Sequence, residues 1–465
     1  MKGHVSRVLM VLLPAVLSTV LLLGSGCLDN ADNLRRRIAA EIVARRPHPA
    51  FVPTPLPYDD AALVTRPTPA RAAALRPIVT AMPDVALLPQ IAVITTAAPA
   101  GSGPTPLLTP PPPRRPIVPT ITAAPIPTAI PARRPAPTRA GTVNAADLPP
   151  AAQLEGVTHI WQTWNNCGPA TLAMYLSHFG QQVKQEEAGT QLRPDPDDKN
   201  VSLEEMAAYA RSRGLSATVR VNGDADRLRR LIAAGVPVLI ETWHQERPND
   251  GMGHYRLLVG YDDDAGQWIA YDSYDTRGLV KGQPYTGIRL PYEETERLWA
   301  VFNRLHLVVY DANAAPAILP ILNEDVDEAT LWARALARAQ AEVQARPDDP
   351  YAWFNLGSDL VALGRAKEAG QAYDRARRIG LPWRMLWYQF GPFQAYYETG
   401  RYDEVIALAN ATIATARQTE EAFYWRGLAQ KAKGDTAAAR ASWQRAVELN
   451  PHYTDASTAL AALEK

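Results

Sequence analysis

Cysteine is almost absent from this chain of 465 residues, which contains only Cys27 and Cys167. Two cysteines exclude a fold held together by a framework of disulfides. The eight histidines are scattered, and no His or Cys pair has the spacing of metal ligands, so we expect no metal site and no cofactor. The acidic run Asp262-Asp263-Asp264 falls between two expected strands, and we interpret it as a hairpin turn rather than a calcium site.

Tryptophan is missing from the first 150 residues, although the chain has eleven. Of the 41 prolines, 26 lie between Pro47 and Pro150, and the first 150 residues contain fifteen Lys or Arg against seven Asp or Glu. The neutral chain is therefore a basic N-terminal arm followed by an acidic remainder. Such an arm has too little apolar surface to build a core. The remainder lacks a concentrated basic patch, which argues against nucleic acid as a partner.

The N-terminus has the order of an export signal. A largely apolar run (residues 8–23) follows Lys2 and Arg7, and three small residues precede Cys27. This arrangement resembles a bacterial lipoprotein signal, in which Cys27 is lipidated and becomes the new N-terminus, although Gly24 stands where such signals usually have Leu. An uncleaved membrane anchor and ordinary secretion stay open as alternatives. All three interpretations predict that the folded part lies outside the cytoplasm. A lipidated Cys27 or an uncleaved anchor would also hold it at a membrane.

Residues 28–150 are expected to form a disordered, proline-rich linker after the signal (residues 1–27). Runs such as Pro110–Pro113 favour polyproline II. Fully extended at about 3.1 Å per residue, the proline-rich part would reach roughly 300 Å. We therefore interpret the linker as a tether or stalk. Its thirteen basic residues are all Arg, and a solvated spacer is favoured over contact with anionic lipid or wall polymer.

Residues 151–310 are expected to form an α+β domain. Helices are predicted first and mostly antiparallel strands afterwards, which is the order of that class. A Ser202/Glu205 capping-box pattern marks the start of one helix. Other predicted helices cover residues 167–180, 224–234 and 292–299, and the predicted strands cover residues 216–221, 237–243, 254–261, 267–274 and 305–310.

Four residues of this domain form a candidate catalytic set. Cys167 opens the first predicted helix, where the helix dipole and the unpaired amides favour a thiolate, so we expect a lowered thiol pKa and a nucleophile. Gln162 lies five residues upstream and could donate its side-chain amide to an oxyanion hole. His254 begins a strand and is the candidate base. Asp272 on the neighbouring strand would orient its imidazole.

Each of these roles has a competing interpretation. Cys167 could be a small buried hydrophobe, and Gln162 a surface polar residue. His159 and His244 are alternative bases, and Asp275 is the alternative to the chosen aspartate. Position in the sequence favours the first set but leaves these alternatives open.

The sequence around these residues resembles the double-glycine leader peptidases, cysteine peptidase family 39, a branch of the papain-like enzymes. The resemblance rests on Gln162–Met174, His254–Tyr261 and Tyr271–Tyr274. Two positions depart from the family: Asn166 stands where Asp is usual, and Ser273 stands where Pro often follows the aspartate. No transporter membrane domain or nucleotide-binding motif follows, so maturation of an exported bacteriocin-like peptide does not carry over.

The resemblance implies a papain-like fold and assigns one role to each candidate. Gln162 corresponds to the oxyanion-hole glutamine, Cys167 to the nucleophile, His254 to its base and Asp272 to the orienting residue. The favoured function is an extracytoplasmic thiol peptidase. The alternatives are a catalytically inactive peptide-binding scaffold and a papain-like amidase or transferase acting on wall or isopeptide bonds.

Residues 326–465 are repetitive. Gly364, Gly400 and Gly434 recur at the period of about 34 residues that is typical of the tetratricopeptide repeat. The middle copy is degenerate, with Phe393 at the position of the usual glycine. We expect an all-α tetratricopeptide-repeat solenoid whose concave face binds a protein partner or a polypeptide substrate. The alternative is a stack that only stabilises or spaces the preceding domain.

Overall fold

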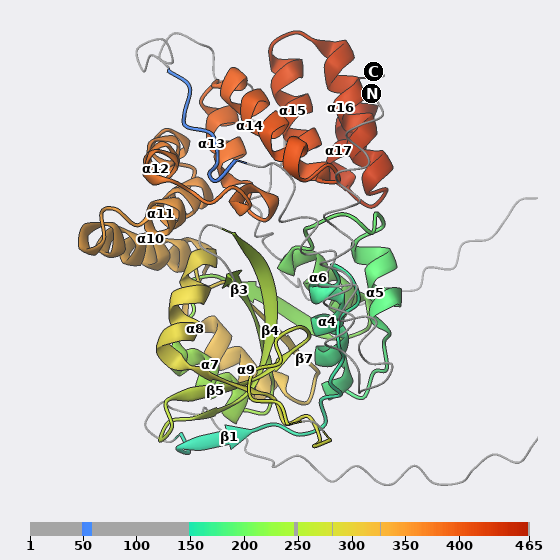
Figure 1. Cartoon of the computed structure of the whole chain (residues 1–465), viewed down its shortest axis with the longest axis vertical. Helices are drawn as coiled ribbons and strands as arrows, with labels where there is room; N and C mark the ends of the chain where they lie inside the picture. The colour runs from blue at the N-terminus through green and yellow to red at the C-terminus, as the bar shows by residue number, and fades with distance from the viewer. Residues whose placement is uncertain (1–48, 58–147, 246–249, 281, 326, 464–465) are drawn as a thin grey trace, which may run out of the picture. The chain divides into compact units, whose positions relative to one another are not determined.

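The computed structural model of the chain describes residues 49–57, 148–245, 250–280, 282–325 and 327–463 (Figure 1). The expected export signal with Cys27, and most of the proline-rich linker, lie outside these residues. Within the described part, none of the helices is both long and apolar enough to cross a membrane.

A mixed domain follows the linker, as the α+β prediction required. Its centre is a seven-stranded sheet with the order β2-β7-β3-β4-β5-β6, and β1 pairs with β4 beside this path. All the pairings are antiparallel. The strands are β1 (Ala151–Gln153), β2 (Ser216–Arg220), β3 (Val238–Gln245), β4 (Gly251–Asp262), β5 (Gln267–Asp272), β6 (Ile288–Pro291) and β7 (His306–Tyr310).

Both faces of this sheet are apolar and covered by helices. Side chains alternate along β4, so Tyr255 and Leu257 join one core and Leu258 joins the other. A register shift between Leu258 and Gly260 interrupts the pairing of β4 with β5. The first core contains α4 (Cys167–His178), α5 (Gln185–Leu192) and α6 (Leu203–Ser212), and the second contains α7 (Ala225–Ala233), α8 (Tyr292–Trp299) and α9 (Ala315–Leu322).

The predicted capping box at the start of α6 is confirmed. The Ser202 hydroxyl accepts from the Glu205 N–H at 3.2 Å, and Oε2 of Glu205 accepts from the Ser202 N–H at 2.8 Å. Sequence analysis missed β1, β6, α5 and α9. These elements have only three to eight residues.

A stack of helices forms the C-terminal part, in agreement with the repeat prediction. Glycines at the repeat positions allow close packing: a Cβ on Gly357 would lie 2.7 Å from the Tyr373 ring, and one on Gly427 would lie 2.4 Å from Nε1 of Trp443. The helices are α10 (Glu328–Ala345), α11 (Pro350–Ala362), α12 (Ala366–Ile379), α13 (Gly391–Glu398), α14 (Tyr402–Thr415), α15 (Glu420–Ala432), α16 (Thr436–Leu449) and α17 (Thr454–Ala461).

The repeats and the sheet domain contribute side chains to one hydrophobic core. Trp243 of β3 and Phe302, which follows α8, belong to the same hydrophobic core as the repeat aromatics. Polar contacts accompany this packing, because Nδ2 of Asn303 donates to Oδ1 of Asp359 at 2.6 Å. Nδ2 of Asn355 donates to the carbonyl of Ala300 at 2.7 Å.

The structure differs from the expected disordered linker at residues 49–57, which lie along the repeats. Val52 is buried there, and its N–H donates to the carbonyl of Leu381 at 2.8 Å. Further on, the Leu56 N–H donates to Oε2 of Glu404 at 2.8 Å. An extended backbone has no internal hydrogen bonds, so its amides and carbonyls are available to a neighbouring surface. The amino-acid composition of the linker alone did not predict this contact with the repeats.

Candidate active site

The turn before α4 places Cys167 at the first position of that helix. Asn165 has a left-handed backbone (φ 57°), which Asn tolerates better than most residues. The Asn166 side chain does not cap the helix. Its Nδ2 instead donates to Oε1 of Gln185 at 2.9 Å, and its Oδ1 accepts from Nη2 of Arg193 at 3.1 Å. These contacts hold the turn that presents Cys167.

Cys167 is partly exposed at a pocket of only about 10 Å³. Burial raises the pKa of its thiol to about 11, although backbone hydrogen bonds at Tyr255 and Gly168 oppose this effect. The predicted lowering of the thiol pKa is therefore wrong for this structure, because loss of water outweighs the helix N-terminus. The Cys167 side chain is therefore a neutral thiol near pH 7. Other residues lining the pocket include Arg193, Lys199, Glu241, Gly253 and Tyr388.

His254 and Asp272 are joined by a hydrogen bond. Nε2 of His254 lies 2.8 Å from Oδ1 of Asp272, and both side chains are buried. They come from the adjacent strands β4 and β5. Burial lowers the pKa of His254, although the nearby aspartate opposes that shift. The resting imidazole is therefore neutral and able to accept a proton.

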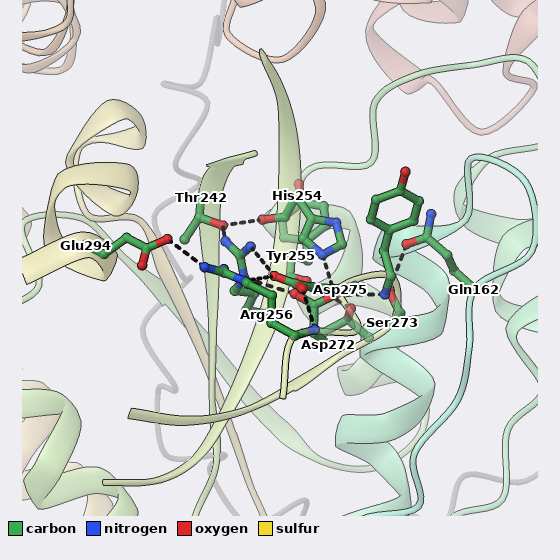
Figure 2. A network of polar contacts seen from close by, with 12 residues as sticks. Gln162, Thr242, His254, Tyr255, Arg256, Asp272, Ser273, Asp275 and Glu294 are labelled. Carbon is green, nitrogen blue, oxygen red and sulfur yellow. Dashed lines mark hydrogen bonds and ion pairs between the residues drawn. The ribbon is translucent and has the colours of Figure 1, made fainter. Parts of the chain in front are cut away.

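Asp272 is held by several donors besides the histidine (Figure 2). Nε of Arg256 donates to its Oδ2 at 2.9 Å, and the N–H groups of Tyr274 and Asp275 donate to its Oδ1 at 2.8 Å. Although burial opposes ionisation, His254 and Arg256 hold the pKa of Asp272 well below its usual value. Sequence analysis missed Arg256; the signal was an arginine inside an otherwise apolar strand.

Gln162 is fixed beside the residue that follows Asp272. Its Oε1 accepts from the Ser273 hydroxyl at 2.8 Å, and its N–H donates to the Ser273 carbonyl at 2.9 Å (Figure 2). The departure from the family at Ser273 thus supplies a bond that proline could not make. With its oxygen engaged, the amide nitrogen of Gln162 is the part available to stabilise an oxyanion.

Cys167 and His254 are not hydrogen-bonded to each other in the described part of the chain. The thiol meets the backbone of Tyr255, the residue after the histidine. The imidazole points with Arg256 to the other side of β4, toward Asp272. A bond between nucleophile and base often forms fully only when substrate is bound. The structure therefore links His254 directly to Asp272 and places Gln162 beside Ser273, whereas Cys167 meets β4 at the backbone of Tyr255.

The competing residues take other positions. Nε2 of His159 lies 2.7 Å from the backbone carbonyl of Asp272, and the His244 ring lies 5.7 Å from the His254 ring. Asp275 binds Arg277 through its carboxylate. Asp272 is thus the carboxylate that pairs with His254. In the described residues, no group of three or more His, Cys, Asp or Glu is arranged to hold a metal ion.

A larger cavity of about 130 Å³ adjoins the pocket at Cys167. Sheet-domain and repeat residues both line it. Asn200, Glu241, Tyr255 and Tyr388 line the cavity and the pocket alike. Tyr388 precedes α13, so the repeats form part of the surroundings of the cysteine. Sequence analysis gave no indication of this contribution.

Comparison with protein families agrees with this arrangement. Residues 146–305 match the Peptidase_C39 like family, and residues 420–453 match the tetratricopeptide repeat. Both predicted resemblances are confirmed at the level of family and fold. No protein of curated function matches the chain.

Several solved structures are similar to parts of the chain. A putative C39-like peptidase from Bacillus anthracis is 16% identical over 35% of this chain and 98% of its own, with a TM-score of 0.27. Xylellain, a cysteine protease from Xylella fastidiosa, is 17% identical over 36% of this chain and 88% of its own, with a TM-score of 0.24. MamA from Desulfovibrio magneticus is 19% identical over 28% of this chain and 72% of its own, with a TM-score of 0.26.

Proposed function

We propose that this chain is an extracytoplasmic cysteine peptidase whose repeats bind a polypeptide. The observation that carries the proposal is the 2.8 Å hydrogen bond between His254 and Asp272, on the strand whose next residue, Tyr255, meets the Cys167 thiol through its backbone. The match of the domain to a peptidase family supports the same chemistry. A histidine held by a carboxylate beside a helix-terminal cysteine is the arrangement that thiol acyl transfer requires.

In the proposed mechanism, His254 takes the proton of Cys167 as the sulfur attacks a peptide carbonyl. Gln162 and a backbone amide stabilise the oxyanion of the tetrahedral intermediate. The imidazolium then protonates the leaving amine, which departs and leaves a thioester on the sulfur. Water, deprotonated by His254, hydrolyses the thioester and restores the thiol. Asp272 stabilises the imidazolium throughout.

Turnover of a peptide library by the full chain tests this proposal. The wild type is expected to release new amino termini, and Cys167→Ala or His254→Ala to lower the rate by about 10³-fold or more. Cleavage that persists in Cys167→Ala would assign the activity to another site or a contaminant. Wall fragments assayed in parallel distinguish a peptidase from an amidase. A peptidase would release amines only from the peptides, and an amidase only from the wall fragments.

The second candidate function is a peptide-binding scaffold without catalysis. It is favoured by the small pocket at Cys167 and by the raised pKa of its thiol. This candidate predicts that peptides bind wild type and Cys167→Ala equally and that neither protein cleaves them. Binding together with cysteine-dependent cleavage would reject it.

The proposed location rests on the order of residues 2–27, which is that of an export signal ending at Cys27. Lipidation at this cysteine would anchor the protein to a membrane. Metabolic labelling with an alkynyl fatty acid is expected to mark the wild type and not Cys27→Ser. An unlabelled but membrane-bound chain would indicate an uncleaved anchor, and an unlabelled chain in the medium would indicate secretion.

A further inference from the structure

Glu241 is a buried acid inside an apolar strand. It lies in β3 opposite Tyr255 and is 5% exposed. Two other deeply buried carboxylates bind arginine, because Asp272 binds Arg256 and Glu404 binds Arg377 and Arg401. The buried carboxylates of Asp359 and Glu420 accept hydrogen bonds from asparagine amides instead. Glu241 has no such ion pair within the described ranges. An acid without a counter-ion at this depth lowers the stability of the fold.

Burial of Glu241 outweighs the side-chain hydrogen bond with Tyr255, which favours the ionised form of the acid. The Tyr255 hydroxyl lies within reach of the carboxyl, but that hydroxyl donates its hydrogen to the carbonyl of Val201. Burial raises the pKa of Glu241 to about 8. The carboxyl is therefore mostly protonated near pH 7, and no arginine or lysine among the described residues forms an ion pair that would favour its ionised form.

The position of Glu241 connects it to the candidate active site. It lines both the pocket at Cys167 and the 130 Å³ cavity. A Cβ on Gly253 would lie 3.0 Å from Oε1 of Glu241 and 3.1 Å from the Tyr388 ring. The absence of a side chain at Gly253 thus leaves room in which the acid and a repeat tyrosine approach each other beside the nucleophile.

The walls of the cavity suit a cation on an apolar stem. Most of the lining is apolar or aromatic, and it includes no Lys or Arg among the residues described. Arg193 and Lys199 line only the smaller pocket, where Arg193 binds Asn166, and Lys199 lies 3.9 Å from Asp197. Aromatic faces attract cations and also pack against methylene groups. The aromatic residues of the cavity are Tyr255, Phe302, Trp332, Tyr373, Tyr388 and Phe390.

We propose that this cavity binds a positively charged group of the polypeptide substrate, with Glu241 as its counter-ion and Tyr388 of the repeats as part of its wall. The proposal deepens the peptidase function and rests on it. The group is an ammonium or a guanidinium, carried by a Lys or Arg side chain or by a free amino terminus. Substrate selection then requires the peptidase domain and the repeats together.

Binding to the full chain carrying Cys167→Ala tests this proposal without chemistry. N-acetylarginine methylamide is compared with the citrulline analogue, which has nearly the same shape and no charge. We expect the arginine compound to bind about tenfold more tightly or better, because a hydrogen-bonded charge pair typically adds that much. Glu241→Gln should abolish the preference. Glu204→Gln, a change at another acid that lines the same cavity, should keep it.

A second pair of probes distinguishes the sources of the charge. Norleucine methylamide with a free amino group is compared with its N-acetyl form. A preference for the free amine that is lost in Glu241→Gln assigns the cavity to an amino terminus, whereas the arginine preference assigns it to a side chain. Equal binding of charged and neutral probes, or a preference unchanged in Glu241→Gln, overturns the proposal.

Proton release provides a measurement that needs no variant at Glu241. A cation that ionises this acid should release about one proton at pH 7, which calorimetry in buffers of different ionisation enthalpy detects. Binding of a charged probe without proton release contradicts the proposal even if Glu241→Gln fails to fold. The outcome is separate from the peptidase function: selective binding without turnover in the wild type rejects catalysis alone, and turnover without selective binding rejects this inference alone.

Discussion

Arg256 and His254 bind opposite oxygens of the same carboxylate. Nε of Arg256 donates to Oδ2 of Asp272 at 2.9 Å, and His254 meets Oδ1 at 2.8 Å. All three side chains are buried. The candidate base is thus oriented by an aspartate whose own position and charge depend on an arginine. Two predictions test this dependence.

Arg256→Met should destabilise the fold and disturb the base together. Removing the cation leaves Asp272 ionised, buried and short of a partner, which typically costs about 3–5 kcal/mol. Urea unfolding measures this loss, and peptide turnover should fall with it. Arg277→Met is the matched control, because Arg277 also binds a carboxylate but its side chain is 48% exposed. Equal losses in the two variants would contradict a special role for Arg256.

Asp272→Asn should change how stability depends on pH. The pKa of Asp272 is held below its ordinary value, so its ionised form stabilises the folded state above about pH 4. That contribution is lost as the pH falls toward the folded-state pKa. The unfolding free energies of wild type and Asp272→Asn should therefore differ most near pH 7, and the difference should shrink steadily as the pH falls below about 4. Asp275→Asn should show a smaller difference, and a difference for Asp272→Asn that does not shrink would argue against an ionised Asp272.

The raised pKa of Cys167 predicts slow alkylation near neutral pH. In a Cys27→Ser background, the rate with iodoacetamide should rise about tenfold per pH unit up to pH 9.5 without a plateau, because only the thiolate reacts. Tyr388→Ala should open the pocket to water and lower the apparent pKa. A rate already at its plateau near pH 6 would instead support the thiolate that the helix position predicts.

The contact between the N-terminal segment and the repeats should contribute to stability. Val52 is buried against them, and Nε of Arg377 donates to the carbonyl of Pro53 at 2.8 Å. Val52→Asp would bury an unpaired carboxylate, so we expect a loss of about 2–4 kcal/mol or release of the segment. Thermal unfolding and limited proteolysis measure the two outcomes. Val280→Asp is the control, since Val280 is 66% exposed, and equal behaviour of both variants would reject the contact.

Sequence patterns predicted the elements whose signals are local. The bounds of α8 coincide with the predicted residues 292–299, and the capping box at Ser202 is present. The pairing of His254 with Asp272 was predicted as well, because neighbouring strands bring these positions together. In these cases a hydrophobic period, a capping pattern or the adjacency of two strands is sufficient to predict the feature.

The remaining features depend on contacts between distant segments. A helix N-terminus alone predicts a thiolate at Cys167, but the packing that raises the thiol pKa involves strand and repeat residues far away in the sequence. The approach of Glu241 to Tyr388 is equally long-range. Proline content indicated an unfolded arm and did not reveal that Val52 finds a buried site on the repeats. Local patterns do not encode which distant surface covers a residue.

If Cys27 is anchored to a membrane as proposed, the contact of residues 49–57 with the repeats limits the distance between that membrane and the folded part. An anchor at Cys27 would be separated from the first bound residue by only about 20 residues, which span at most about 70 Å. The roughly 300 Å expected for the whole arm is therefore not its reach. Residues 58–147 join two points held by the same folded unit. A protease that cut the chain between residues 58 and 147 would leave residues 49–57 held to the repeats by non-covalent contacts alone.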